Sequence, residues 1–220
     1  MASNELPIAR NRLEVRPGAV HVPDWLNTSF QQYLLEKCRE WAVPPAGLRE
    51  VRTPGGGKMS ARQVCLGWHW APYRYAKTVF DGDGSPVKPF PAVLNKLARS
   101  AVIDAYGSDE HLSGDYDVAV INFYDEHAQM GMHRDEEELA RDPVVSLTLG
   151  DACQFRLGNT ETRSKPYEDV RLESGDLFVF GKDSRMSYHG VTRVFANTAP
   201  LDLGLKGRVN ITLRVSGLSH

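Results

Sequence analysis

The chain lacks the features that mark several broad classes of protein. No stretch of its 220 residues approaches the ~18 consecutive apolar residues of a membrane span, and the N-terminal region has no apolar signal-peptide core. The three cysteines, Cys38, Cys65 and Cys153, are far apart and form no C-x-x-C pair. We therefore expect buried, reduced thiols and no disulfide framework or cysteine zinc site. We also expect a soluble, cytoplasmic protein with no membrane partner.

A strong charge of either sign is also missing. The formal net charge is -2, with 25% charged and 41% hydrophobic residues, which is ordinary usage for a globular protein. Bulk electrostatics therefore gives no indication of a nucleic-acid-binding domain, whose pI often exceeds ~9. The length suits one core, and no repeat or linker interrupts the chain, so we predict a single domain over residues 1–220 and a monomer.

Two helices are predicted in the first half of the chain. From Asn27 to Trp41 apolar residues recur at helical intervals, and Thr28 and Gln31 have the spacing of a capping box. A second amphipathic stretch runs from Pro91 to Tyr106, where the proline suits a first turn and Gly107 is placed to end the helix.

The second half of the chain indicates strands. Short apolar or alternating runs, separated by turn residues and without intervening helices, are typical of an antiparallel sandwich or barrel. These runs lie at 117–124, 143–150, 152–158, 170–181, 186–194 and 208–215, and Gly18 to Trp25 reads as a further short strand. The sequence thus predicts a mainly β fold with helices near its N-terminus.

A possible metal site begins with His133 and Asp135. Side chains at i and i+2 of an extended backbone point to the same side and can hold one metal ion. Chance alone supplies about half an H-x-D per chain of this composition, so the pair needs support. His189, in the strand-like SYHGV, offers a third ligand. Two histidines and one carboxylate suit a non-haem iron(II) oxygenase, and catalytic zinc is the alternative.

The run at 208–215 bears on that choice. Alternation places four polar side chains on one face of the strand: Arg208, Asn210, Thr212 and Arg214. The plain interpretation is the solvent-facing side of an edge strand. Two arginines at the ends of one strand face also suit a small dicarboxylate such as 2-oxoglutarate, for which a zinc hydrolase has no use.

The C-terminal half resembles the AlkB-type nucleic-acid dealkylases, which are iron(II)/2-oxoglutarate dioxygenases. The resemblance rests on Asn122-Phe123-Tyr124, His133-Arg134-Asp135-Glu136, Ser146 to Gly150, Gly175-Asp176, Ser184-Arg185, Tyr188-His189-Gly190 and Arg208-x-Asn210-x-Thr212-x-Arg214. Upstream it extends to Thr53 to Gly56, Leu66-Gly67-Trp68 and Lys88 to Pro91.

The resemblance implies an α+β, mainly β fold. Its core would be a double-stranded β-helix (jelly roll) at 116–218, with N-terminal helices and a nucleotide-recognition lid at 1–115. It implies three iron ligands, His133, Asp135 and His189, and two partners of the 2-oxoglutarate carboxylates, Arg208 and Arg214. Asn122, Tyr124 and Asn210 would be supporting cosubstrate contacts, and Arg185 would brace the site.

The implied activity is oxidative demethylation of alkylated DNA or RNA, with Fe(II), 2-oxoglutarate and O2. The favoured substrates are 1-methyladenine and 3-methylcytosine in DNA, followed by methylated RNA or tRNA. The resemblance suggests four substrate-binding residues: Trp68, Tyr75, Glu137 and Arg163. Trp70 and Tyr73 fit core packing equally well, and the glycine-rich Thr53 to Lys58 reads as a phosphate contact or a plain turn. A same-fold hydroxylase of proteins or small molecules, and a non-catalytic binding module, stay open.

Overall fold

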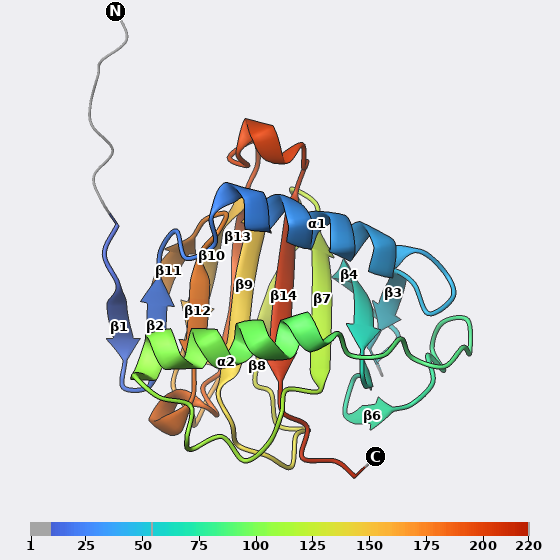
Figure 1. Ribbon diagram of the computed structural model, residues 1–220, viewed down its shortest axis with the longest axis horizontal. Helices are drawn as coiled ribbons and strands as arrows, with labels where there is room; N and C mark the ends of the chain where they lie inside the picture. The colour runs from blue at the N-terminus through green and yellow to red at the C-terminus, as the bar shows by residue number, and fades with distance from the viewer. Residues whose placement is uncertain (1–9, 54, 220) are drawn as a thin grey trace, which may run out of the picture.

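Two large antiparallel sheets and two α-helices form most of the fold in the computed structural model, which describes residues 10–53 and 55–219 (Figure 1). The larger sheet has the order β1 (Leu13–Arg16), β2 (Ala19–Val22), β12 (Leu177–Phe180), β9 (Val144–Gly150), β14 (Arg208–Arg214), β7 (Val118–Tyr124), β4 (Lys58–Leu66) and β3 (Arg49–Arg52). The smaller sheet has the order β11 (Glu168–Leu172), β10 (Ala152–Leu157), β13 (His189–Phe195) and β8 (Met130–His133). A separate hairpin pairs β5 (His69–Ala71) with β6 (Arg74–Ala76).

The helices α1 (Thr28–Ala42) and α2 (Ala92–Tyr106) lie across the outer face of the larger sheet (Figure 1). Gly107 ends α2 with a left-handed φ of 85°, as predicted. The predicted capping box is wrong, because Asn27 caps α1 and its side chain accepts a hydrogen bond from the Phe30 N–H. Gln31 instead donates to the carbonyl oxygen of Leu26, at 2.8 Å.

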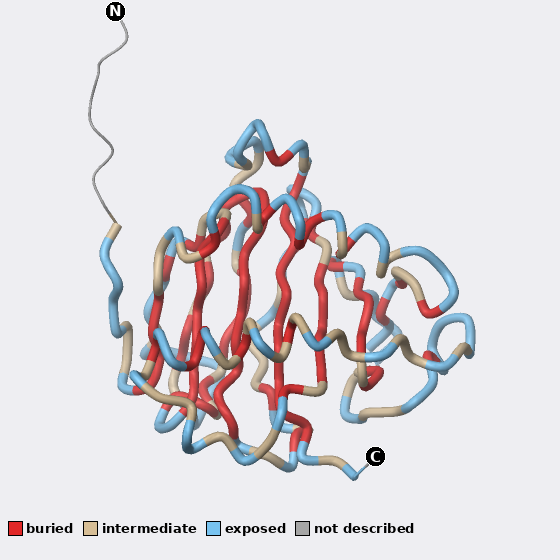
Figure 2. Tube along the Cα trace, in the orientation of Figure 1, coloured by how far each residue is buried: buried red, intermediate tan, exposed pale blue. Residues whose placement is uncertain are grey.

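Two hydrophobic layers follow from the alternation of the strands. One layer lies between the helices and the larger sheet and includes Leu34, Leu94, Ile121, Leu147 and Ile211. The other lies between the two sheets and includes Phe155, Leu157, Val170, Phe178 and Phe180. Figure 2 shows the resulting run of buried residues through the central strands. The mainly β jelly-roll expectation is confirmed.

The strand β14 lies at the centre of the larger sheet. It pairs with β7 on one side and β9 on the other, and all seven of its residues are buried. The interpretation of this run as an edge strand is therefore wrong. Val209, Ile211 and Leu213 pack towards the helices, so the alternate residues of β14, which are polar, face the smaller sheet.

The segment between the predicted helices is more regular than its sequence indicates. It forms the β3–β4 hairpin, which joins the larger sheet, and the β5–β6 hairpin. Thr53 to Lys58 is the turn of the first hairpin: the N–H of Thr53 donates to Gly57 and that of Gly56 to Thr53, while Pro54 lies outside the described residues. Strands from both sides of the predicted division at residue 116 therefore share one sheet.

The cysteines are buried and free, as expected. Among the described residues, no helix has the length and apolar character needed to cross a membrane.

Candidate active site

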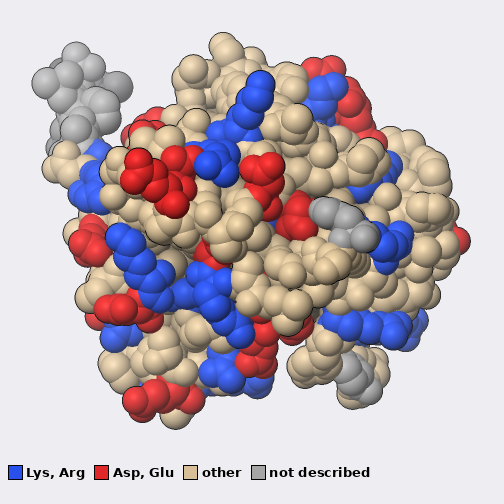
Figure 3. All heavy atoms as spheres, turned by 60° about the horizontal axis from the view of Figure 1, so that its bottom comes forward, with Lys and Arg blue, Asp and Glu red and all other residues tan. Residues whose placement is uncertain are grey.

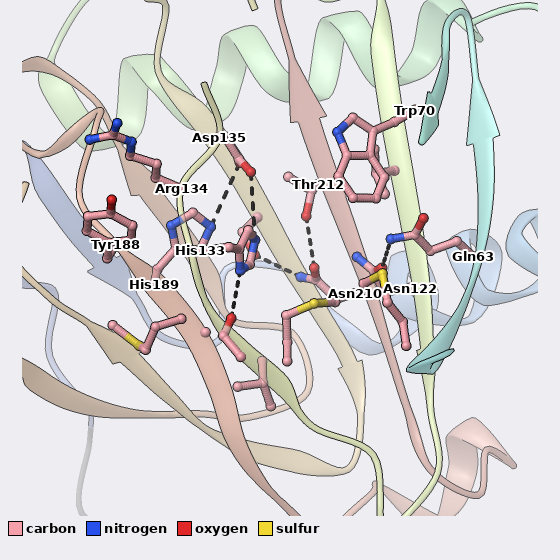
Figure 4. A pocket seen from close by; sticks show the side chains of 18 of the residues that line it. Gln63, Trp70, Asn122, His133, Arg134, Asp135, Tyr188, His189, Asn210 and Thr212 are labelled. Carbon is pink, nitrogen blue, oxygen red and sulfur yellow. Dashed lines mark hydrogen bonds and ion pairs between the residues drawn. The ribbon is translucent and has the colours of Figure 1, made fainter. Parts of the chain in front are cut away.

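The three predicted metal ligands converge where the edge of the smaller sheet meets the polar face of the larger one (Figure 4). His133 ends β8 and His189 begins β13, and the two residues pair directly across these strands. Asp135 follows two residues after His133. The candidate ligand atoms all lie within 4.8 Å of one another, and this is the only such cluster found among the described residues.

Backbone carbonyls orient both imidazoles. Nδ1 of His133 lies 2.9 Å from the carbonyl oxygen of Gly131, and Nδ1 of His189 lies 3.0 Å from that of Ser187. A carbonyl oxygen only accepts hydrogen bonds, so each Nδ1 carries the proton in these contacts. The lone pair of each Nε2 is therefore left to coordinate a metal ion beside Asp135.

The protonation states also suit a metal ion. Burial opposes ionisation of Asp135, but Arg214 and the two histidines outweigh burial and lower the pKa of the carboxyl to about 2. Burial, together with the adjacent His133, lowers the pKa of His189 to about 4. At neutral pH Asp135 is therefore a carboxylate and His189 a neutral imidazole, which are the forms that bind metals.

Several buried polar atoms at the site make no hydrogen bond. They are Oδ2 of Asp135, Nε and Nη1 of Arg208, and Nε of Arg214. Buried polar groups are nearly always satisfied, so such atoms need a ligand to explain them. A cation beside Asp135 and an anion beside the arginines would supply the missing partners, so these residues fit a metal ion and a carboxylate cosubstrate.

These residues line one cavity of about 330 Å³. Its floor is the polar face of β14 and β7: Asn210 and Thr212 lie between the two arginines of β14, and β7 contributes Asn122 and Tyr124, which pairs with Arg208. The opposite wall comes from β8, β13 and the turn after Asp135. Trp70, Tyr73 and Arg163 also contribute to the lining. The cavity thus combines a metal-binding end with a partly aromatic wall.

Comparison with known proteins agrees with this geometry. The family model of the 2OG-Fe(II) oxygenase superfamily matches residues 18–214. The chain belongs to this superfamily. An AlkB homolog of Caulobacter vibrioides, described as an alpha-ketoglutarate-dependent dioxygenase, is 31% identical over 97% of this chain and 94% of its own length. This relative places the chain among the AlkB-type members.

Two further comparisons extend the picture. An Arabidopsis thaliana protein named DNA N(6)-methyladenine demethylase ALKBH1D is 33% identical over 91% of this chain and 50% of its own length. The solved structure of OsALKBH1 matches with a TM-score of 0.81 and 31% identity, covering 92% of this chain and all of that one. The chain spans about half the length of the Arabidopsis relatives it matches. Membership of the superfamily supports iron(II), 2-oxoglutarate and O2, and not catalytic zinc.

All five predicted cosubstrate residues of this AlkB-type oxygenase line the cavity. The Arg208 guanidinium lies over the Tyr124 ring at 5.0 Å, and its Nη2 donates to Oγ1 of Thr148 at 3.2 Å. Burial raises the pKa of Tyr124 to about 12, so its hydroxyl stays protonated. Asn210 donates to Ser146 at 2.8 Å. At the other end of β14, Arg214 contacts Asp135.

Gln63, on β4, lines the cavity although no sequence pattern pointed to it. Its Nε2 donates to Oδ1 of Asn122 at 2.8 Å, while its own Oε1 is buried in the lining without a partner (Figure 4). Its signal in the sequence is weak, because a single glutamine in a strand-like run has no recognisable spacing.

The predicted substrate residues divide into two groups. Glu137 and Arg163 line the cavity, but Trp68 and Tyr75 do not. Trp68 packs in the cluster with Cys65, Val118 and Val120, and its indole N–H donates to Asp117 at 3.1 Å. The Tyr75 hydroxyl donates to Glu138.

Two other aromatic residues of the same segment form part of the cavity wall in place of Trp68 and Tyr75. Trp70 and Tyr73 line the cavity, and Tyr73 is 72% exposed at the tip of the β5–β6 hairpin with a φ of 71°. The backbone φ > 0 is uncommon for a non-glycine residue and marks a constrained position. The interpretation as core packing does not fit the exposed Tyr73, whereas Trp70 both lines the cavity and packs against the cluster that contains Trp68.

Proposed function

We propose that this protein is an iron(II)- and 2-oxoglutarate-dependent dioxygenase that removes N-methyl groups from bases of nucleic acid. The observation that carries the proposal is the juxtaposition, in one cavity, of the ligand triad and the unpartnered guanidinium nitrogens of Arg208 and Arg214. A metal site alone fits many reactions, whereas buried cationic donors beside it call for an anionic cosubstrate.

His133, His189 and Asp135 would hold the iron through two Nε2 atoms and one carboxylate oxygen. Iron(II) with 2-oxoglutarate and dioxygen supplies an oxidation that places a hydroxyl on the N-methyl carbon while 2-oxoglutarate becomes succinate and carbon dioxide. The N-hydroxymethyl group then leaves as formaldehyde. Arg208 and Arg214 would bind the cosubstrate carboxylates, and Tyr124, Asn122 and Asn210 would orient the molecule between them.

The aromatic wall suits a base taken out of its stack. Enzymes that act on a base atom read the extruded base by stacking and by hydrogen bonds to its edge. Trp70 and Tyr73 would supply the stacking faces, so the β5–β6 hairpin would be the predicted nucleotide-recognition lid. Glu137 lines the cavity and burial raises its pKa; its carboxyl group would contact the edge of the base. Arg163 would meet the phosphate backbone at the rim.

The surface charges indicate that nucleic acid would be held by a few local contacts and not by a strongly basic surface. On the face drawn in Figure 3, basic and acidic side chains are intermixed, in line with the net charge of -2. We therefore infer that affinity comes mainly from the base pocket and from a few phosphate contacts. Log affinity should fall with log salt with the shallow slope of a few neutralised phosphates.

DNA carrying 1-methyladenine or 3-methylcytosine is the first proposed substrate, and methylated RNA or tRNA is the second. The name of the Arabidopsis relative adds N6-methyladenine to the candidates. We propose that the enzyme acts as a monomer, which size-exclusion chromatography with light scattering would test.

The decisive experiment loads the protein with iron(II) and 2-oxoglutarate and adds matched oligonucleotides that carry one methylated base or none. We expect succinate and formaldehyde in equal amounts with the methylated strand, and the base restored by mass spectrometry. Succinate without any change in the oligonucleotides would point to a hydroxylase of another substrate. A protein that binds neither metal nor 2-oxoglutarate would be a non-catalytic binding module.

A further inference from the structure

Glu138 is a buried carboxylate next to the metal site that the roles proposed above do not use. It is 1% exposed, and both of its oxygens are bonded. Oε2 accepts from Nη2 of Arg185 at 3.0 Å, and Oε1 accepts from Nη1 of Arg214, also at 3.0 Å. The Tyr75 hydroxyl donates to Oε1 as well. One carboxylate therefore joins two arginines and a tyrosine.

Both of these arginines also hold Asp135. Nη1 of Arg185 donates to the backbone carbonyl oxygen of Asp135 at 2.8 Å, and Nη2 of Arg214 lies 2.7 Å from its Oδ1. The backbone and the side chain of the metal ligand are thus fixed by two guanidinium groups that share Glu138. Two carboxylates and two guanidinium groups balance in charge, and each of the four residues is at most 6% exposed.

The same cluster reaches the hairpin that lines the cavity. Tyr75 on β6 pairs directly with Trp70 on β5, and Trp70 is part of the cavity wall. Nη1 of Arg214 donates to the Tyr75 hydroxyl at 3.1 Å. A base that stacks on Trp70 would contact the strand pair that carries Tyr75. Through the Tyr75 hydroxyl, this contact would reach the guanidinium of Arg214 beside Asp135.

We propose that Glu138 is a positioning residue: it acts through Arg214 to set the orientation of Asp135, and through Tyr75 it couples the filling of the base pocket to 2-oxoglutarate turnover. The coupling to a base rests on the proposed function, whereas the effect on the metal ligand does not. Partners that orient a metal ligand typically contribute about 10- to 100-fold to metal affinity.

The test uses Glu138→Gln, Tyr75→Phe and, as a control, Asp176→Asn. Asp176 is also a buried carboxylate bonded to an arginine, Arg10 at 2.7 Å, and it does not line the cavity. Mn(II) binding by titration calorimetry, in the presence of 2-oxoglutarate, reports the metal site without turnover. The ratio of succinate to formaldehyde, together with the KM and kcat for 2-oxoglutarate, reports coupling.

We expect Glu138→Gln to weaken Mn(II) binding about 10- to 100-fold and to raise the KM for 2-oxoglutarate. Tyr75→Phe should raise the succinate-to-formaldehyde ratio severalfold while Mn(II) affinity stays nearly constant. Asp176→Asn should lower the melting temperature and leave both readouts unchanged. If Glu138→Gln changes only the melting temperature, as the control does, Glu138 is merely structural and the proposal is overturned.

An unchanged product ratio in Tyr75→Phe would remove the coupling to the hairpin. A protein that never demethylates an oligonucleotide but loses Mn(II) affinity in Glu138→Gln would contradict the proposed substrate class while supporting the role of Glu138 at the metal.

Discussion

Nη2 of Arg214 lies 2.7 Å from Oδ1 of Asp135, so a guanidinium proposed to bind the cosubstrate also holds a proposed metal ligand. The second oxygen of Asp135, Oδ2, is buried, makes no hydrogen bond and lies 3.8 Å from Nε2 of the proposed ligand His189. The carboxylate is therefore divided between two tasks, one oxygen facing an arginine and the other left for the metal ion.

The two arginines of β14 can therefore be distinguished by experiment. Arg214→Lys should weaken both Mn(II) and 2-oxoglutarate binding, whereas Arg208→Lys should weaken only 2-oxoglutarate binding, because lysine cannot reproduce the guanidinium fork. Losing hydrogen bonds to a charged group costs about 1.5–3 kcal/mol, or about 10- to 100-fold in affinity. Calorimetry on both variants checks this. The control is Arg193→Lys, which replaces an exposed arginine. Equal effects of the two substitutions on Mn(II) would contradict it.

Removing a metal ligand should abolish turnover. We expect His189→Ala to lose more Mn(II) affinity than the roughly 10- to 100-fold caused by losing an outer-shell partner. Succinate formation should fall to background. His127→Ala is the matched control, because its side chain is 87% exposed and it is not part of the ligand cluster. Undiminished succinate formation by His189→Ala would remove His189 from the ligand set.

The cavity wall predicts which aromatic residues bind the base. Tyr73→Ala should raise the KM for a methylated oligonucleotide about 5- to 100-fold, since stacking on one aromatic residue contributes about 1–3 kcal/mol. The affinity for 2-oxoglutarate should not change. Tyr33→Ala, which removes a partly exposed tyrosine from α1, is the control. If both variants bind the oligonucleotide equally well, Tyr73 has no stacking role.

Acid stability should depend on Asp176. Burial opposes its ionisation, but hydrogen bonds from His21 and Arg10 outweigh burial and lower its pKa below the ordinary value of 3.8. With a folded-state pKa below the unfolded one, Asp176 stabilises the fold fully above about pH 4, and this contribution is lost as the pH falls through the folded-state pKa.

We therefore expect Asp176→Asn to lower the free energy of unfolding by about 3 kcal/mol at pH 7, because it removes the buried carboxylate that pairs with His21 and with the partly buried Arg10. The loss should shrink below pH 4. Urea denaturation of both proteins from pH 3 to pH 7 measures this, and a pH-independent difference would be the contrary result.

Alternation within short segments predicted the pairing of His133 with Asp135 and the polar face of β14, and the structure brings these residues and His189 to one cavity. What covers a strand face is not a local property. The polar side of β14 was equally consistent with solvent until its pairing with both β7 and β9 was known. The choice of wall residues depended on the β5–β6 hairpin, whose short strands turn Tyr75 towards Glu138 and leave Trp70 and Tyr73 at the cavity. Gln63 had only a weak local signal.

Because β14 lies at the centre of the larger sheet, the proposed active site is complete only when that sheet has folded. This strand joins β7 to β9 and also carries Arg208 and Arg214. A chain in which β14 has not docked has a split sheet, and it lacks the guanidinium groups proposed to recruit the cosubstrate. Under the proposed roles, a partly folded molecule that has bound iron therefore cannot bind 2-oxoglutarate beside it.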